Sequence, residues 1–422
     1  MYRLIFLFIA TTALAQTPID HAKAKAAFDQ AHQLCTADNG RLWGHTLCGP
    51  MLFADRTTFY AVGNQADETG KLRAEDGVFV GKIPMQLAIA NTATSWDSVI
   101  WSEVVWPLPD DPMVRGILLM HESFHRLQMQ LKLLMKNPGN DHLDTLRGRY
   151  LFRLELRAYH AALSAEGKAR TDAIREALTF RAAREKEFPG SAQNERDLES
   201  NEGLAEYTGF KVGGGDPKEP LESGDKRPSF VRSSAYITGP ALGFLLDEVA
   251  PGWHAKALAG EPTDGLLAQA VRFRPPADLE AAVASYAGHY GGAELLAEET
   301  ARDEENKRRQ AEYRAKLVEG PVLRIGFEKM NITFDPNRLF PLDDLGTVYT
   351  VLRISDNWGI LELTSGPALL AKDWSAVTVE APANARGTEI DGPGWKLHLN
   401  AGYKLVPGAR KGDFTVGKAG GG

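Results

Sequence analysis

Residues 111–136 read DPMVRGILLMHESFHRLQMQLKLLMK, and this stretch predicts a long helix at the centre of the fold. Asp111 is a favourable N-cap, and Pro112 suits the first helical position because its missing amide hydrogen is not needed there. Apolar side chains recur along one face of the helix, so we expect that face to be buried. The sequence Asn137-Pro138-Gly139 then ends the helix.

The sequence before this helix indicates β-structure. Residues 21–37 should form a first helix, and residues 47–106 contain short β-branched and aromatic runs separated by Gly, Asn and Asp. Such a pattern predicts a small, mostly antiparallel sheet. The stretch from Asn91 to Trp106 is the expected edge strand, beside a cleft next to the 111–136 helix. The expected strands are residues 52–53, 57–62, 78–80, 87–89 and 99–106.

Helical periodicity dominates after residue 136 and gives way to strand and turn patterns after Gly320-Pro321. About 100 residues in this second style suggest a β-sandwich or small barrel. The expected helices are residues 147–165, 168–187, 193–210, 236–249, 277–287 and 293–317. The expected strands are residues 322–327, 331–334, 348–354, 359–363, 376–379 and 396–399.

We therefore predict an α+β chain: a mainly helical body with a small antiparallel sheet, followed by a C-terminal all-β domain. The expected parts are a signal peptide at 1–15, a helix and sheet region at 16–110, a helical region at 111–319 and the β domain at 320–422. A composition of 43% hydrophobic and 24% charged residues is that of a globular protein. The formal charge is −7 and the basic residues are scattered, which disfavours a nucleic-acid partner.

The N-terminus resembles an export signal. Arg3 precedes the apolar run 4–10, and Ala13-Leu14-Ala15 fits a signal-peptidase cleavage site. The alternative is a buried N-terminal helix. After signal removal no stretch reaches about 18 consecutive apolar residues, so we expect no integral membrane segment. The expected location is secreted or periplasmic.

The chain has two cysteines, Cys35 and Cys48. In an oxidising compartment they could form a disulfide that stabilises the fold by restricting the unfolded chain. The alternative is two unpaired, half-buried thiols. No C-x-x-C pair is present, so we do not expect the cysteines to bind a metal.

His121-Glu122-Ser123-Phe124-His125 is an H-E-x-x-H motif in the middle of the predicted 111–136 helix. The i, i+4 spacing places both imidazoles on the buried face, near enough to bind one Zn²⁺ through bonds of about 2.0–2.1 Å. Glu122 lies beside the metal, where it can accept a proton from a metal-bound water. The alternative is a pair of hydrogen-bonded core histidines, which would be a costly way to fill a core.

A catalytic zinc needs a third protein ligand and an open fourth position. The motif Asn201-Glu202-Gly203-Leu204-Ala205-Glu206 lies on a predicted helix. Together with H-E-x-x-H it resembles the gluzincin group of zinc metallopeptidases. The resemblance implies that Glu202 is the third ligand and that Glu206 holds a ligand imidazole by its other nitrogen. The alternative is a pair of solvent-facing carboxylates, and Glu155 and Glu199 are the other candidates for the third ligand.

Tyr236-Ile237-Thr238-Gly239 is similar to the Tyr-x-x-Gly helix of aminopeptidase-like gluzincins. The resemblance implies that the Tyr236 hydroxyl hydrogen-bonds the reaction's oxyanion; the alternative is a tyrosine that packs at a helix start. The Gly-x-Met-Glu-Asn motif of the aminopeptidase-N-like family is missing, so the resemblance does not extend to exopeptidase activity. The longer H-E-x-x-H-x-x-G-x-x-H pattern does not fit either, because Gln128 and Leu131 occupy its Gly and His positions.

These residues predict an exported zinc-dependent metallopeptidase with one zinc ion per chain, which hydrolyses peptide bonds through metal-bound water with Glu122 as general base. The expected partner is a peptide or protein substrate. The alternative is a non-catalytic zincin-fold protein whose C-terminal β domain binds a cell-envelope or extracellular partner. The aromatic residues that would serve such a surface are Trp358, Trp374 and Trp395, although domain cores hold such residues too.

Overall fold

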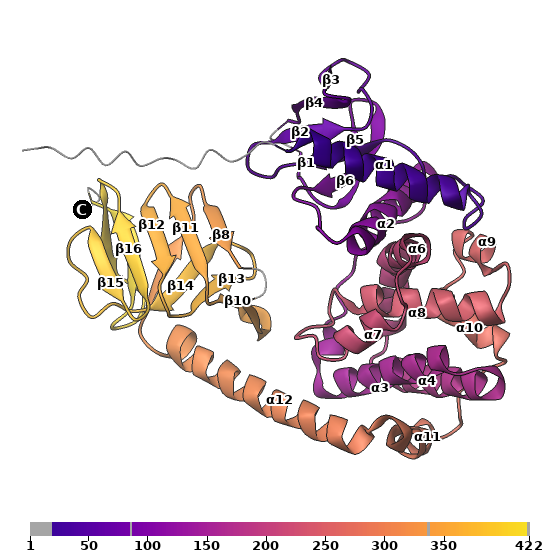
Figure 1. Ribbon diagram of the computed structural model, residues 1–422. Coiled ribbons are helices and arrows are strands. Elements are labelled where there is room, and N and C mark those ends of the chain that lie inside the picture. Colours follow the sequence, from indigo (N-terminus) through magenta and orange to yellow (C-terminus); the bar gives the residue numbers. More distant parts are fainter. Residues whose placement is uncertain (1–18, 85–86, 336–337, 420–422) are drawn as a thin grey trace, which may run out of the picture. The chain divides into compact units, whose positions relative to one another are not determined.

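The computed structural model describes residues 19–84, 87–335 and 338–419. They form an N-terminal sheet, a central helical region and a C-terminal region with two sheets (Figure 1). The predicted α+β class is therefore confirmed. The chain divides into two compact units, Met1–Glu299 and Thr300–Gly422, and each is described by itself. The domain limits drawn from the sequence remain a prediction.

The described part of the N-terminal unit contains a sheet with the spatial strand order β3-β4-β2-β1-β6-β5. The strands are β1 Met51–Ala54, β2 Tyr60–Gly63, β3 Arg73–Glu75, β4 Val78–Lys82, β5 Thr92–Trp96 and β6 Val99–Val105. β1 and β6 pair in parallel, and the other neighbours pair antiparallel. The sheet is thus mostly antiparallel, as predicted, and β5 is one of its edges.

Two strand predictions in this region are wrong. Residues 91–106 form a hairpin of β5 and β6 rather than a single strand. Asp97 and Ser98 join the two strands with φ of 52° and 63°, the left-handed conformation that a tight hairpin turn needs. The expected strand at residues 87–89 is a loop, and its apolar side chains pack in the same small cluster as Trp101.

The predicted central helix is present as α2, Pro112–Gln130. The carboxylate of Asp111 caps its start, accepting hydrogen bonds from the amides of Met113 and Val114 at 2.8 and 3.0 Å. α2 contacts β5, β6 and a later helix, α6 Leu204–Gly213. Residues 119–128 are all buried, so α2 is enclosed along its second half.

The prediction that this helix continues to Lys136 is wrong. Lys132 has a left-handed φ of 56°, and its amide bonds to the carbonyl of Met129. The amide of Leu133 bonds to the carbonyl of Gln128. This pair of hydrogen bonds is a Schellman closure, which satisfies the last carbonyls of the helix and turns the chain away.

The other elements in the described residues of the N-terminal unit are helices. Its elements are α1 His21–Asp38, η1 Asp141–Asp144, α3 Leu146–Ser164, α4 Gly167–Glu187, α5 Ser191–Leu198, η2 Glu199–Gly203, α6 Leu204–Gly213, α7 Glu219–Gly224, α8 Ser234–Val249, α9 Trp253–Leu258, α10 Thr263–Ala270, α11 Leu279–Ala287 and η3 Gly288–Tyr290. The helix expected at 193–210 is divided into α5 and α6 by η2, a π-helical turn. The short helices α7, α9 and α10 lie where the sequence did not predict any.

Cys35 and Cys48 form a disulfide, as predicted. Disulfides persist in oxidising compartments, so the bond agrees with export. The predicted signal peptide, residues 1–15, lies outside the described residues. Within the described part of the chain, every helix is too short or too polar to cross a membrane.

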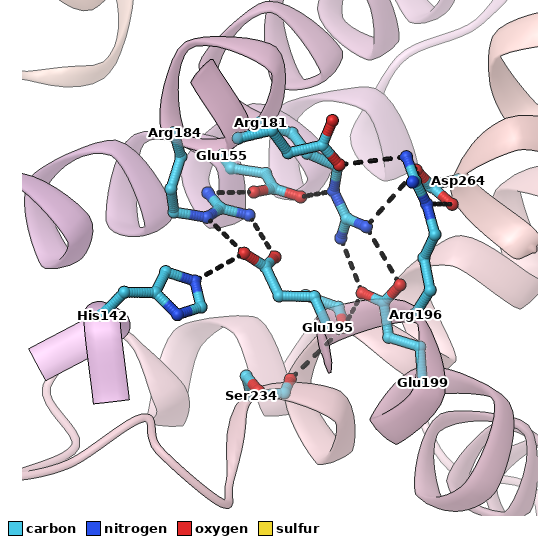
Figure 2. Close-up of polar contacts among 11 residues, drawn as sticks. His142, Glu155, Arg181, Arg184, Glu195, Arg196, Glu199, Ser234 and Asp264 are labelled. Carbon is cyan, nitrogen blue, oxygen red and sulfur yellow. Dashed lines mark hydrogen bonds and ion pairs between the residues drawn. The ribbon is translucent and has the colours of Figure 1, made fainter. Parts of the chain in front are cut away.

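A buried network of charged side chains connects α3, α4, α5 and η2. Figure 2 shows the carboxylate of Glu155 between the guanidinium groups of Arg181 and Arg184, at 2.8 and 2.6 Å. Arg184 also binds Glu195 at 2.6 Å, and Arg181 binds Glu199 at 2.6 Å. All five side chains are buried. Charges buried in this way are tolerated because each is paired, so the network depends on every member.

The network makes stability depend on pH. Burial alone would raise the pKa of Glu195, but the charge of Arg184 and hydrogen bonds from His142 and Arg184 outweigh burial and hold this pKa well below its ordinary value. The folded chain therefore binds a proton at Glu195 more weakly than the unfolded chain does. We expect the contribution of Glu195 to be complete above about pH 5 and to be lost progressively below about pH 4.

Urea unfolding from about pH 3 to about pH 7 checks this prediction. The Glu195→Gln variant should lose less stability on acidification than the wild type, because its side chain has no proton to take up. An equal loss in the two proteins would show that Glu195 does not contribute.

The C-terminal unit contains a seven-stranded sheet, ordered β17-β18-β7-β14-β13-β10-β9, and a five-stranded sheet, ordered β15-β16-β12-β11-β8, in its described residues. The strands are β7 Val322–Gly326, β8 Asn331–Phe334, β9 Leu339–Leu342, β10 Gly346–Tyr349, β11 Leu352–Asp356, β12 Gly359–Leu363, β13 Ala368–Ala371, β14 Ala376–Glu380, β15 Glu389–Gly392, β16 Trp395–Leu399, β17 Tyr403–Pro407 and β18 Phe414–Lys418. The helix α12, Gly292–Arg314, begins in the N-terminal unit and continues into the C-terminal unit, which also contains η4 Ala315–Glu319 and η5 Asp343–Leu345.

The two C-terminal sheets share one apolar core, as in a β-sandwich. Val377 on the larger sheet and Leu361 on the smaller one belong to the same buried cluster. The predicted strand at 348–354 is wrong: it corresponds to β10 and β11, which lie in different sheets.

The tryptophans of the C-terminal unit have different surroundings. Trp358 and Trp395 are 1% exposed and belong to the sandwich core, so they are not available to a binding surface. Trp374 is 49% exposed.

Candidate metal centre

Two elements far apart in the sequence meet at one buried point of the N-terminal unit. α2 provides His121 and His125, and η2 provides Glu202. The Nε2 atoms of His121 and His125 lie 3.0 Å apart. Glu202 Oε2 lies 3.2 Å from His125 Nε2 and 3.5 Å from His121 Nε2. The predicted ligands therefore converge on a buried group that could hold a metal ion.

The separations of the three atoms fit a tetrahedral zinc ion. Bonds of about 2.0–2.1 Å at tetrahedral angles place neighbouring ligand atoms about 3.3 Å apart. The observed distances of 3.0, 3.2 and 3.5 Å lie on either side of this value. Two imidazole nitrogens and one carboxylate oxygen are also a donor set of catalytic zinc sites.

The outer nitrogen of each imidazole faces a hydrogen-bond acceptor. His121 Nδ1 lies 2.6 Å from Glu206 Oε2, and His125 Nδ1 lies 2.7 Å from Gln128 Oε1. The amide nitrogen of Gln128 donates to two backbone carbonyls of η2, which assigns its oxygen to the side that faces His125. Both imidazoles can therefore donate from Nδ1 and present Nε2 to the centre.

Two imidazole nitrogens and a carboxylate oxygen thus face one another in a buried space that needs a positive charge between them, either a metal ion or, without one, a proton on an Nε2 atom. The pKa values agree. Burial would lower the pKa of His121, but hydrogen bonds with Glu202 and Glu206 raise it well above its ordinary value. Burial would raise the pKa of Glu202, but hydrogen bonds from His121 and His125 hold it well below. The centre therefore favours a cation.

Glu122 lies beside this centre. Its Oε1 is 4.0 Å from His121 Nε2, while its Oε2 is buried without a hydrogen-bond partner among the described residues. Burial raises the pKa of Glu122, although the charges of His121 and His125 oppose the rise. A buried carboxylate oxygen without a protein partner can accept a hydrogen bond from water or from a substrate.

Tyr236, at the start of α8, contacts two members of the group. Its hydroxyl donates to Glu202 Oε2 at 2.7 Å, and its ring stacks parallel to that of His121 with centroids 5.7 Å apart. Burial and then the charge of Glu202 raise the pKa of Tyr236, so the hydroxyl keeps its proton and acts as a donor. A role toward a reaction oxyanion stays a prediction.

Close contact between η2 and α8 brings Tyr236 within reach of Glu202. Gly203 and Gly239 lie at the contact, where a Cβ atom on Gly239 would stand 2.3 Å from the carbonyl oxygen of Gly203. Any larger residue at position 239 would push the two elements apart.

The other candidates for the third ligand lie elsewhere. Glu155 is bound by Arg181 and Arg184, and Glu199 is bound by Arg181. These carboxylates belong to the buried network rather than to the metal centre.

The roles of two residues at the centre were not predicted from the sequence. Asn201 donates to Glu202 Oε1 at 3.0 Å, which leaves Oε2 directed at the histidines. Gln128 lies three positions after His125 on the same face of α2, and this spacing was a usable signal. Its partners on η2 could not be foreseen, because they depend on a π-helical turn, which changes the backbone hydrogen bonding of an otherwise regular helix.

Comparison of this chain with known protein families, with curated proteins and with solved structures found no match. The function of this chain is therefore inferred from the geometry of the centre.

Proposed function

We propose that this chain is an exported zinc-dependent metallopeptidase. The observation that carries the proposal is the convergence of His121, His125 and Glu202 within 3.0–3.5 Å, with the outer nitrogens of both imidazoles already bonded. The unpartnered oxygen of Glu122 beside that group favours a catalytic centre, because a purely structural zinc site needs no general base.

Each residue of the centre has a proposed role. Zinc held by His121, His125 and Glu202 would act as a Lewis acid toward the scissile carbonyl and lower the pKa of a water molecule. Glu122 would accept a proton from the attacking water and pass it to the leaving amine. Tyr236 would donate a hydrogen bond to the developing oxyanion.

The edge strand β5 supports a peptide as the substrate. In the described sheet β5 pairs with β6 on one side, and α2 contacts both strands. An extended peptide could add to the free side of β5 through main-chain hydrogen bonds, next to the helix that carries His121 and Glu122. Export is supported by the disulfide between Cys35 and Cys48.

The test is a cleavage assay of the purified mature chain on a broad peptide library, with and without a chelator. We expect cleavage that the chelator abolishes and added zinc restores, and no cleavage by the His121→Ala variant. Stoichiometric zinc in the wild type without cleavage of any peptide would instead favour the non-catalytic zincin-fold alternative. No bound zinc and no cleavage would refute the proposal.

A further inference from the structure

The carboxylate of Glu199 is buried three positions before Glu202, yet it faces away from the metal centre. Arg181 binds both of its oxygens, at 2.6 and 3.0 Å. The hydroxyl of Thr238 donates to Glu199 Oε1 at 2.8 Å. Arg181 is itself held by Glu155 at 2.8 Å (Figure 2). One carboxylate on η2 is thus bonded to α4 and to α8 at the same time.

The hydrogen bond between Glu199 and Thr238 joins the same two elements, η2 and α8, as the hydrogen bond between Glu202 and Tyr236. Glu202 follows Glu199 on η2 by three residues, and Tyr236 precedes Thr238 on α8 by two. The hydrogen bond from Tyr236 to Glu202 therefore lies next to the one from Thr238 to Glu199. A slide of α8 along η2 that broke one bond would also move the other.

We propose that Glu199 is a positioning residue, which fixes η2 against α8 and so sets the placement of Glu202 and Tyr236. The buried network holds Glu199 in place, because Arg181 bonds the carboxylate of Glu199 to α4. This inference rests on the proposed function, since it treats Glu202 as a metal ligand and Tyr236 as a donor to the substrate.

Glu195 offers a matched comparison within the same network. It is 3% exposed, against 5% for Glu199, and Arg184 binds both of its oxygens at 2.6 and 3.0 Å. Its third hydrogen bond is with His142 on η1, at 2.7 Å, and not with α8. The two glutamates therefore have similar burial and similar arginine partners, but Glu199 alone of the two is bonded to the helix of Tyr236.

The test compares the Glu199→Gln, Thr238→Val and Glu195→Gln variants of the full mature chain. Zinc affinity is measured by competition with a chelating dye, and kcat and KM are measured on a peptide that the wild type cleaves. We expect Glu199→Gln to weaken zinc binding by about 10–100-fold, the usual effect of losing a residue that orients a ligand. We also expect it to lower kcat more than it raises KM, because the displaced Tyr236 acts in the transition state.

Thr238→Val removes the hydroxyl and keeps the side-chain shape, so it should lower zinc affinity and kcat as Glu199→Gln does. If Glu199→Gln does not fold, Thr238→Val still tests the inference. Glu195→Gln should lose stability and keep the zinc affinity of the wild type. Equal zinc affinities in the wild type, Glu199→Gln and Thr238→Val would overturn this inference but not the proposed function. The inference would also be overturned if Glu195→Gln lost as much zinc affinity as Glu199→Gln. A wild type that binds no zinc would overturn the proposed function as well.

Discussion

The Glu122→Gln variant should bind one zinc ion per chain and hydrolyse peptides about 10²–10⁴-fold more slowly than the wild type. The amide keeps the size of the side chain but cannot accept a proton from water. Zinc should stay bound, because the nearer oxygen of Glu122 is 4.0 Å from His121 Nε2 and is not one of the three converging atoms. Elemental analysis and steady-state kinetics measure the two quantities.

Glu103→Gln is the matched control for this experiment. Glu103 on β6 is 1% exposed, against 2% for Glu122, and it too has a buried oxygen without a partner among the described residues. Burial raises the pKa of Glu103 to about 7. The charge of Glu122 contributes to this rise, but the carboxylate of Glu103 is not among the converging groups of the centre, so Glu103→Gln should keep most of its turnover. Undiminished hydrolysis by Glu122→Gln would remove Glu122 from the mechanism, and an equal loss in both variants would show a general effect of altering a buried carboxylate.

The Arg184→Met variant should lose about 3–5 kcal/mol of the free energy of unfolding. Arg184 is fully buried between Glu155 and Glu195, at 2.6 Å from each. Methionine fills part of the space but leaves both carboxylates without this partner, and a buried charge that has lost its partner is costly. Urea unfolding should show a lower midpoint with an unchanged slope.

Lys168→Met on the same helix serves as the control. Lys168 is exposed and pairs with Asp172 one turn away. Exposed pairs of this kind contribute about 0–1 kcal/mol, so this variant should unfold nearly as the wild type does. A loss for Arg184→Met no larger than for Lys168→Met would contradict the structural importance of the network.

The features that the sequence predicted well depend on local pattern. Asp111 predicted the start of α2, and the spacing of His121 and His125 predicted that both lie on one face of it. Both predictions succeeded because helix starts and helix faces follow from neighbouring residues. The pairing of Cys35 and Cys48 followed from their number and from the expected compartment. Glu202 was placed by its resemblance to a known motif, and the structure brings it to the two histidines.

The features that the sequence did not predict depend on contacts between distant segments. Arg181 and Glu155 are ordinary helix residues in the sequence, and their pairing becomes visible where α3 and α4 pack together. The end of α2 at Gln130 depends on the left-handed backbone of Lys132, a residue type that gives no such signal. Alternating apolar residues could not show that β10 and β11 enter different sheets, because both face one shared core.

The most direct test is a crystal of the zinc-loaded mature chain measured at the zinc absorption edge. We expect one anomalous peak, about 2.0–2.2 Å from His121 Nε2, His125 Nε2 and a carboxylate oxygen of Glu202. Zinc bound at any other place, with these three side chains holding no ion, would contradict the assignment of a metal centre and the enzyme function proposed from it.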